Sequence, residues 1–301
     1  MVWVRYSDFL TWNRGIYQYA QTSFNKKNYS SAKNRFIRMS KNPVVIVTGA
    51  SRGLGAATAR WLARAGAAVT LISRSEAALK SVAEEVQQLG GTALVFKADI
   101  SDAGACQKAV AKTLERFERL DALVNSAGIV EPIAPLAQTD PDRWQYNIAV
   151  NLLGPFYLTH AAISELRKQN GRIINVSSGA ATTAMENVSA YCAAKAALNH
   201  FTRVLAAEES GLTVLTMRPG VVDTRMQEII RREGPNCMSA EQNAYYQGLK
   251  ERGELEPPEV PARSIAWLAL QGPHEFSGDF LNYDDPRIAR PALDFFGEKL
   301  Q

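Results

Sequence analysis

Three residues of this chain, Ser178, Tyr191 and Lys195, have the types and the spacing of a proton-transfer site. Tyr191 and Lys195 are four residues apart, so on a helix the phenol and the ammonium would share one face, about one turn apart. Ser178 comes thirteen residues before Tyr191 and follows an apolar run at 173–176. Tyrosine and lysine at this spacing also occur on solvated helix faces, so the pattern needs support from elsewhere in the chain.

That support is a glycine-rich turn, TGASRGLG, at residues 48–55. It follows a short apolar run, PVVIV, and precedes an alanine-rich helical stretch. Gly49, Gly53 and Gly55 would allow a tight turn and let backbone N–H groups approach a pyrophosphate at the helix N-terminus. The spacing is G-x-x-x-G-x-G rather than the commoner G-x-G-x-x-G of dinucleotide folds. The strand, turn and helix together predict a phosphate cradle.

The same strand-then-helix rhythm continues along the chain. Apolar runs occur at 67–73, 92–97, 122–128, 172–178 and 212–220, separated by helical stretches. Uninterrupted apolar runs, rather than alternation, are typical of a parallel sheet covered on both faces. We therefore expect an α/β, three-layer Rossmann fold with a doubly wound parallel sheet of about seven strands. Residues 42–301 would form this single domain.

The first 41 residues differ in composition from the rest. They hold eight Lys/Arg and one acid, a net charge of +7, which leaves −3 for the remainder. The basicity of the chain therefore belongs to this extension, and we expect no nucleic-acid surface. The extension reads as a mitochondrial presequence, a disordered tail or an over-long start with Met39 as the initiator. A cytoplasmic protein is the simplest expectation, and a mitochondrial one follows if the extension is a presequence.

From residue 42 to about 283 the motifs resemble the short-chain dehydrogenase/reductase family. TGASRGLG resembles its cofactor turn, NSAG at 125–128 its N-[NS]-A-G element, and YCAAK at 191–195 its active-site helix. RPGVVDT at 218–224 resembles the Pro-Gly segment beside the nicotinamide. The ending SGDFLNYDD and the glycine turn resemble fungal benzil-reductase-like and sepiapterin-reductase-like members.

The resemblance implies a catalytic tetrad of Asn151, Ser178, Tyr191 and Lys195, with Asn151 twenty-seven residues before the serine. Hydride transfer to a ketone creates an alkoxide, so Tyr191 would act as general acid, with its pKa lowered from about 10 by Lys195 and the oxidised nicotinamide. Ser178 would hydrogen-bond the substrate oxygen. By resemblance, Lys195 also binds the nicotinamide ribose and Asn151 supports a water-linked proton relay.

The cofactor expected is NADP(H). The second strand ends in Ser73 and Arg74 with no acidic residue, and Arg52 lies in the glycine turn, so two guanidiniums could bind a 2′-phosphate. Asp99 resembles the adenine-contacting aspartate of the family, although it could instead cap the next helix. The cofactor contacts expected are Gly49, Ser51, Arg52, Gly53, Leu54, Gly55, Ser73, Arg74, Asp99, Ile100, Asn125, Ala127, Gly128, Tyr191, Lys195, Pro219, Gly220, Val222 and Thr224.

Substrate selection is expected to depend on residues 224–261, where the strand–helix rhythm stops. A long polar insertion beside the Pro-Gly segment is typical of a lid, and a surface for subunit contact is the alternative. Met185, Val188 and Met226 are candidate pocket residues by position.

These features predict an NADP(H)-dependent carbonyl reductase or alcohol dehydrogenase acting on a ketone or a secondary alcohol. A non-catalytic NADP-binding sensor is the rival class, and an isomerase or dehydratase is a third reading that the intact tetrad disfavours. Three cysteines and three histidines without ligand spacing predict no metal site. The sequence has no long apolar span, so membrane insertion is not expected. The resemblance implies a homo-oligomer, a dimer or a tetramer.

Overall fold

A parallel sheet forms the middle layer of the protein in a computed structural model that describes residues 42–299. The predictions made for residues 1–41 lie outside this part of the chain. The seven strands stand in the order β3-β2-β1-β4-β5-β6-β7. They are β1 (Val44–Thr48), β2 (Ala68–Ser73), β3 (Thr92–Lys97), β4 (Ala122–Asn125), β5 (Arg172–Val176), β6 (Thr213–Arg218) and β7 (Phe280–Asn282).

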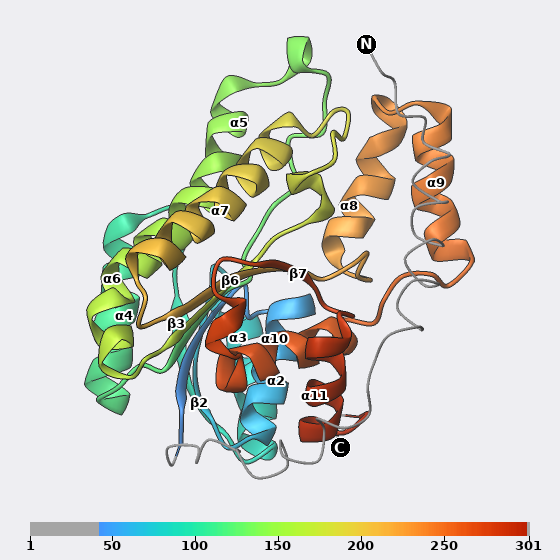
Figure 1. The fold of residues 1–301 in the computed structure, drawn as a ribbon. Coiled ribbons are helices and arrows are strands. Elements are labelled where there is room, and N and C mark those ends of the chain that lie inside the picture. The colour runs from blue at the N-terminus through green and yellow to red at the C-terminus, as the bar shows by residue number, and fades with distance from the viewer. Residues whose placement is uncertain (1–41, 300–301) are drawn as a thin grey trace. The chain divides into compact units, whose positions relative to one another are not determined.

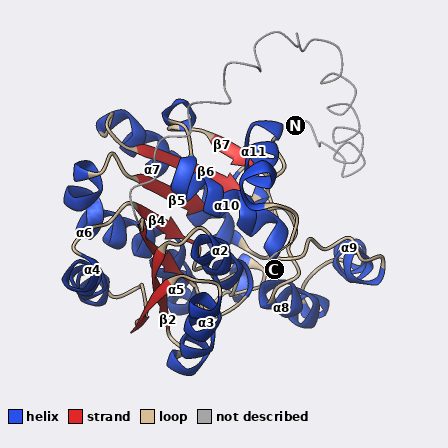
Figure 2. Ribbon diagram, turned by 90° about the horizontal axis from the view of Figure 1, so that it is seen from below, coloured by secondary structure: helices blue, strands red, loops and turns tan. Residues whose placement is uncertain are grey.

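Helices cover both faces of this sheet, as Figures 1 and 2 show. One face carries α2 (Gly53–Arg64), α3 (Glu76–Gln88), α10 (Glu259–Gln271) and α11 (Pro286–Phe296), which pack on one another. The other face carries α4 (Ala103–Phe117), α6 (Gly154–Lys168) and α7 (Ser189–Glu208), with α5 (Pro141–Ile148) packed on α7. The predicted three-layer, doubly wound Rossmann fold is confirmed.

The composition of the strands follows from their place in the sheet. All residues of β1 and β4 are buried, because these central strands are covered on both faces. The edge strand β3 is only partly covered, and its terminal residues Thr92 and Lys97 are exposed. Across the centre, Ile46, Leu123 and Ile173 are fully buried in one apolar cluster, which α4 and α6 complete with residues such as Leu158.

The connection between β3 and β4 crosses from the edge of the sheet to its centre. The chain leaves the edge strand β3, passes through α4 and re-enters the sheet at β4, on the other side of β1. The strand order therefore reverses between β1 and β4, and ligands of such sheets bind at the carboxyl ends of the strands at this point.

The helical stretch between β4 and β5 is not uniform. Its helices α5 and α6 are joined by a π-helical segment, Ala149–Leu153. Within it, Asn151 Nδ2 donates to the main-chain oxygen of Asn147, 3.1 Å away. Such one-turn π segments inside α-helices are frequent at functional sites.

The predicted lid region, 224–261, consists mainly of two helices, α8 (Arg225–Glu233) and α9 (Ala240–Glu251), before α10 begins. Figure 1 shows both beyond the carboxyl end of the sheet. The two ends of the region are joined, since Val222 forms an isolated parallel bridge with Glu256 and Lys250 Nζ lies 2.7 Å from Asp223 Oδ2. Among the described residues, no helix is both long and apolar enough to cross a membrane.

Candidate active site

Ser178, Tyr191 and Lys195 come together at the carboxyl end of β5. Ser178 follows the strand and begins a short 3₁₀ turn, in which its hydroxyl accepts from the N–H of Ala180 at 3.2 Å. Tyr191 and Lys195 occupy the first two turns of α7 and are buried, with 8% and 4% of their surfaces exposed. The neighbouring Ser177 points elsewhere, since its hydroxyl donates to Asn199 on α7.

The Lys195 ammonium is held inside the protein without a carboxylate partner among the described residues. Its Nζ donates to the main-chain oxygen of Val176 at 2.8 Å and lies 5.7 Å from the centre of the Tyr191 ring. Burial lowers the pKa of Lys195 to about 8. The lysine is therefore a cation that loses its proton unusually easily.

The pKa of the Tyr191 phenol is shifted upward, opposite to the expected direction. Burial raises the pKa, and a hydrogen bond with Ser178 acts in the opposite direction without cancelling it. The resemblance implies a pKa lowered by the Lys195 charge, but desolvation of the phenol is the larger effect here. The phenol is thus held in its protonated form beside Ser178, which is the form a proton donor needs.

Asn151 connects the π-helical segment to the loop after β4. Its Nδ2 donates to Ile129 O and Asn147 Oδ1, both at 2.8 Å, and its Oδ1 accepts from Ile129 N at 3.3 Å. Gly128 brings this amide close to the lysine, because a Cβ there would lie 2.9 Å from Asn151 Oδ1 and 3.8 Å from Lys195 Nζ. Only glycine leaves room for this approach.

The glycine turn packs as a phosphate cradle requires. Gly49 has φ +66°, and a Cβ there would lie 2.8 Å from the Cα of Ala127 in the loop after β4. A Cβ on Gly55 would lie 2.5 Å from the carbonyl oxygen of Gly49. Helix α2 begins at Gly53, and neither a side-chain cap nor an acidic residue covers its first turn. Its unpaired N–H groups and positive dipole end fit a pyrophosphate.

Thr48, which sequence reasoning did not select, fixes the loop after β4 beside this turn. It is fully buried, and its hydroxyl accepts from the N–H groups of Ser126 and Ala127, each at 3.0 Å. Nearby, Ser126 Oγ and Asn125 Oδ1 are buried without a hydrogen-bond partner. Unpartnered polar atoms at this edge fit a polar ligand such as a dinucleotide.

The residues expected at the adenosine end form a hydrogen-bonded cluster around Tyr146, which sequence reasoning missed. The Tyr146 hydroxyl donates to Asp99 Oδ2 at 2.6 Å and accepts from Arg74 Nη1 at 2.9 Å. Asp99 Oδ1 also accepts from the N–H and the hydroxyl of Ser101. Burial alone would raise the pKa of Asp99, but the hydrogen bonds from Tyr146 and Ser101 and the Arg74 charge lower it.

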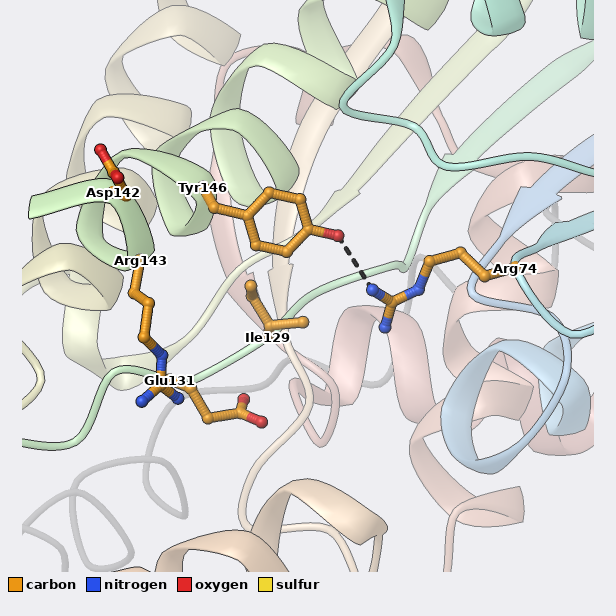
Figure 3. Close-up of a pocket in the computed structure, with 6 residues that line it drawn as sticks. All are labelled: Arg74, Ile129, Glu131, Asp142, Arg143 and Tyr146. Carbon is orange, nitrogen blue, oxygen red and sulfur yellow. Dashed lines mark hydrogen bonds between the residues drawn. The ribbon is translucent and has the colours of Figure 1, made fainter. Parts of the chain in front are cut away.

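Figure 3 shows Arg74 reaching toward Tyr146 on the wall of a pocket of about 360 Å³. The Asp99 carboxylate is thus occupied by Ser101 and by Tyr146 of α5, while helix α4 is capped by Asp102, whose side chain accepts from Ala105 N. The structural alternative for Asp99, capping that helix, is therefore unnecessary. Arg52 is exposed at the start of α2, and Ser73 Oγ accepts from Ser75 N at 3.2 Å.

The remaining expected contacts lie at the same edge of the sheet. Thr224 approaches the glycine turn, since a Cβ on Gly53 would lie 3.1 Å from its Cγ2. Gly220 has φ +76° beside the ring of Tyr283, and Ile100 is buried against Gly154. Ser51 and Leu54 are half-buried in the turn, and Pro219 and Val222 lie between β6 and α8.

The region predicted as a lid contributes to the apolar cluster that contains Tyr191. Tyr191 belongs to an apolar cluster separate from the main core, and the cluster includes Ile230 of α8 and Tyr246 and Leu249 of α9. The three candidate pocket residues, Met185, Val188 and Met226, belong to the same cluster. In this arrangement α8 and α9 would cover the Tyr191 phenol and shield it from water. In residues 42–299, no cluster of His, Cys, Asp and Glu could hold a metal ion.

Comparison with known proteins agrees with this architecture. The family model described as short chain dehydrogenase matches residues 43–234. An uncharacterised oxidoreductase of Saccharomyces cerevisiae is 36% identical over 82% of this chain and 97% of its own. The crystal structure under the same designation has a TM-score of 0.79 and covers 83% of this chain and 99% of that one.

Two further relatives have named activities. A benzil reductase of Saccharomyces cerevisiae that forms (S)-benzoin is 32% identical over 81% of this chain and 97% of its own. An alcohol dehydrogenase of the archaeon Thermococcus sibiricus, solved with 5-hydroxy-NADP, is 27% identical with a TM-score of 0.67, covering 81% of this chain and 98% of that one. With its fold, its glycine turn and these matches, the chain belongs to the short-chain dehydrogenase/reductase family of oxidoreductases.

Proposed function

We propose that this protein is an NADP(H)-dependent carbonyl reductase that interconverts a ketone and a secondary alcohol, with Tyr191 as the general acid and base. The observation that carries the proposal is the convergence of Ser178, Tyr191 and Lys195 at the edge where the glycine turn begins α2. When bound, the nicotinamide would supply the hydride that adds to the carbonyl carbon.

The proton chemistry follows from the three side chains. A carbonyl oxygen near Ser178 Oγ and the Tyr191 hydroxyl would receive a hydrogen bond from the serine and a proton from the phenol. Lys195, with its pKa of about 8, has its Nζ 5.7 Å from the centre of the Tyr191 ring, where its charge would favour the phenolate left after transfer. Asn151 and Lys195 both have side-chain ends next to Gly128, and Asn151 would support a water-linked relay that returns the proton.

The preference for NADP(H) is supported by charge at the end of β2. Arg74 follows the strand, no acid stands in its place to bind a ribose hydroxyl, and Arg52 is exposed at the start of α2. Forked donors on two arginines suit the oxygens of a 2′-phosphate. The archaeal relative solved with 5-hydroxy-NADP is consistent with such a site on this fold.

The substrate class is supported by the apolar cluster around Tyr191. Its aliphatic and thioether side chains suit an aromatic or apolar ketone, and the yeast benzil reductase makes α-diketones the first compounds to test. Steady-state oxidation of NADPH and NADH, followed at the nicotinamide absorbance, should show NADPH-linked turnover with at least one ketone or diketone. Tight NADPH binding with no turnover on the whole panel would favour the non-catalytic sensor instead.

A homo-oligomer is part of the same proposal. Phe156 of α6 and Val204 of α7 are each 43% exposed, and Phe156 contacts Phe201 of α7 with ring centres 6.2 Å apart. Exposed apolar side chains on two adjacent helices suit a contact between copies. Light scattering coupled to size exclusion should give a mass of a dimer or tetramer, and a monomer mass at micromolar concentration would contradict this.

A further inference from the structure

Tyr146 is a residue of α5 that joins two expected adenosine contacts from different strands. Arg74 follows β2 and Asp99 follows β3, and the phenol hydroxyl of Tyr146 lies between them at 2.9 Å and 2.6 Å. The direct distance from Arg74 Nη1 to Asp99 Oδ2 is 3.9 Å. The hydroxyl therefore accepts a hydrogen bond from the cation and donates one to the anion.

From this geometry we infer that Tyr146 is a positioning residue for the 2′-phosphate of NADP(H), acting through Arg74. The inference rests on the proposed function, because it needs the dinucleotide at this edge of the sheet. The Arg74 side chain is 64% exposed and would otherwise sample many rotamers in water. An acceptor fixed on a helix restricts that freedom before the ligand arrives, which lowers the entropic cost of binding.

The surroundings of Tyr146 allow it to hold a fixed position. Its ring is partly buried against the main core cluster, so the hydroxyl is presented from a packed aromatic ring. Asp99 is in turn fixed by two hydrogen bonds from Ser101 to its other oxygen. The pocket of about 360 Å³ shares Arg74 and Tyr146 as wall residues and leaves space beside the cluster (Figure 3).

Two fragments of the cofactor test the inference without any catalytic turnover. Adenosine 2′,5′-bisphosphate carries the 2′-phosphate and adenosine 5′-monophosphate lacks it, so the ratio of their dissociation constants reports the 2′-phosphate contact alone. In Tyr146→Phe, calorimetric titration should show this preference reduced about tenfold, because the charged hydrogen bond is lost while the ring remains. Tyr157→Phe, the same chemical change on α6, should keep the wild-type ratio.

A double-mutant cycle separates positioning through Arg74 from a general structural role. In an Arg74→Ala background the preference should already be low, and Tyr146→Phe should then change the ratio less than twofold. An unchanged ratio in Tyr146→Phe, or an equal loss in the Arg74→Ala background, would overturn the inference while leaving the proposed function intact.

Wild-type protein that binds neither fragment, or binds both equally, would overturn the inference together with the NADP(H) part of the proposed function. Thermal unfolding of each variant checks that the fold is kept. If Tyr146→Phe does not fold stably, the Arg74→Ala variant is measured alone. A ratio of dissociation constants equal to wild type in Arg74→Ala would overturn the inference, because Arg74 would then not contact the 2′-phosphate.

Discussion

Burial of Lys195 should be visible in the pH dependence of stability. The lysine is 4% exposed, and burial lowers its pKa from an ordinary value of 10.5 to about 8. Because the folded-state pKa lies below the unfolded one, the unfolded state binds more protons between these values, and stability rises with pH there. The cost of burying the charge is fully present below about pH 8 and is relieved as the pH approaches 10.5.

The size of the effect follows from the two pKa values. Linkage gives a rise of about 2 kcal/mol in the free energy of unfolding between about pH 7 and pH 9.5, and about 3 kcal/mol over the whole window. Lys195→Met keeps most of the volume, removes the charge and should lack this rise. The variant also loses the hydrogen bond to Val176 O, which adds an offset that does not depend on pH.

The assay is denaturant unfolding of the full chain and of Lys195→Met at several pH values and one protein concentration. The difference between the two proteins should change by about 2 kcal/mol from about pH 7 to pH 9.5 in favour of the wild type. Lys80→Met on α3, which removes a lysine with 64% of its side chain exposed, should show a flat difference. If the difference in free energy of unfolding between the wild type and Lys195→Met also does not change with pH, the buried, destabilised ammonium is refuted.

Two further predictions concern cofactor choice and packing of the tetrad. Arg74→Glu should lower the ratio of kcat/KM for NADPH over NADH by about tenfold or more, because a carboxylate replaces the forked donor and repels a 2′-phosphate; an unchanged ratio would count against the arginine. Gly128→Ala places a Cβ 2.9 Å from Asn151 Oδ1 and 3.8 Å from Lys195 Nζ, so kcat should fall about tenfold or more. Gly211→Ala, whose nearest new neighbour is 3.9 Å away, is the matched control, and equal kinetics of both variants would contradict the tight approach.

The sheet and the glycine turn could be predicted from the sequence because their signals are local. Uninterrupted apolar runs identify strands such as β1 and β5 without any knowledge of their neighbours, and glycines between a strand and a helix indicate a turn. The spacing of Tyr191 and Lys195 likewise needs only the geometry of one helix. These features depend on residues a few positions apart, and the structure has them where the pattern indicated.

The features that sequence reasoning missed depend on contacts between distant segments. Tyr146 forms hydrogen bonds with Arg74 and Asp99, which are 72 and 47 positions away in the sequence. Thr48 forms one with Ser126, which is 78 positions away. The direction of the Tyr191 pKa was also wrong for the protein described here, because the sequence shows the nearby lysine but not the extent of burial. The available signal was an aromatic residue with a hydroxyl, Tyr146, in the mostly polar helix α5.

The most direct test of the account compares wild-type protein with Tyr191→Phe on the best ketone of the panel. Both should bind NADPH with dissociation constants within about threefold, because the phenol hydroxyl is assigned to the substrate oxygen and not to the phosphates. The kcat of the variant should fall by about 10²–10⁴, the usual contribution of a general acid. Turnover equal to wild type in a variant that binds NADPH normally would contradict Tyr191 as the proton donor.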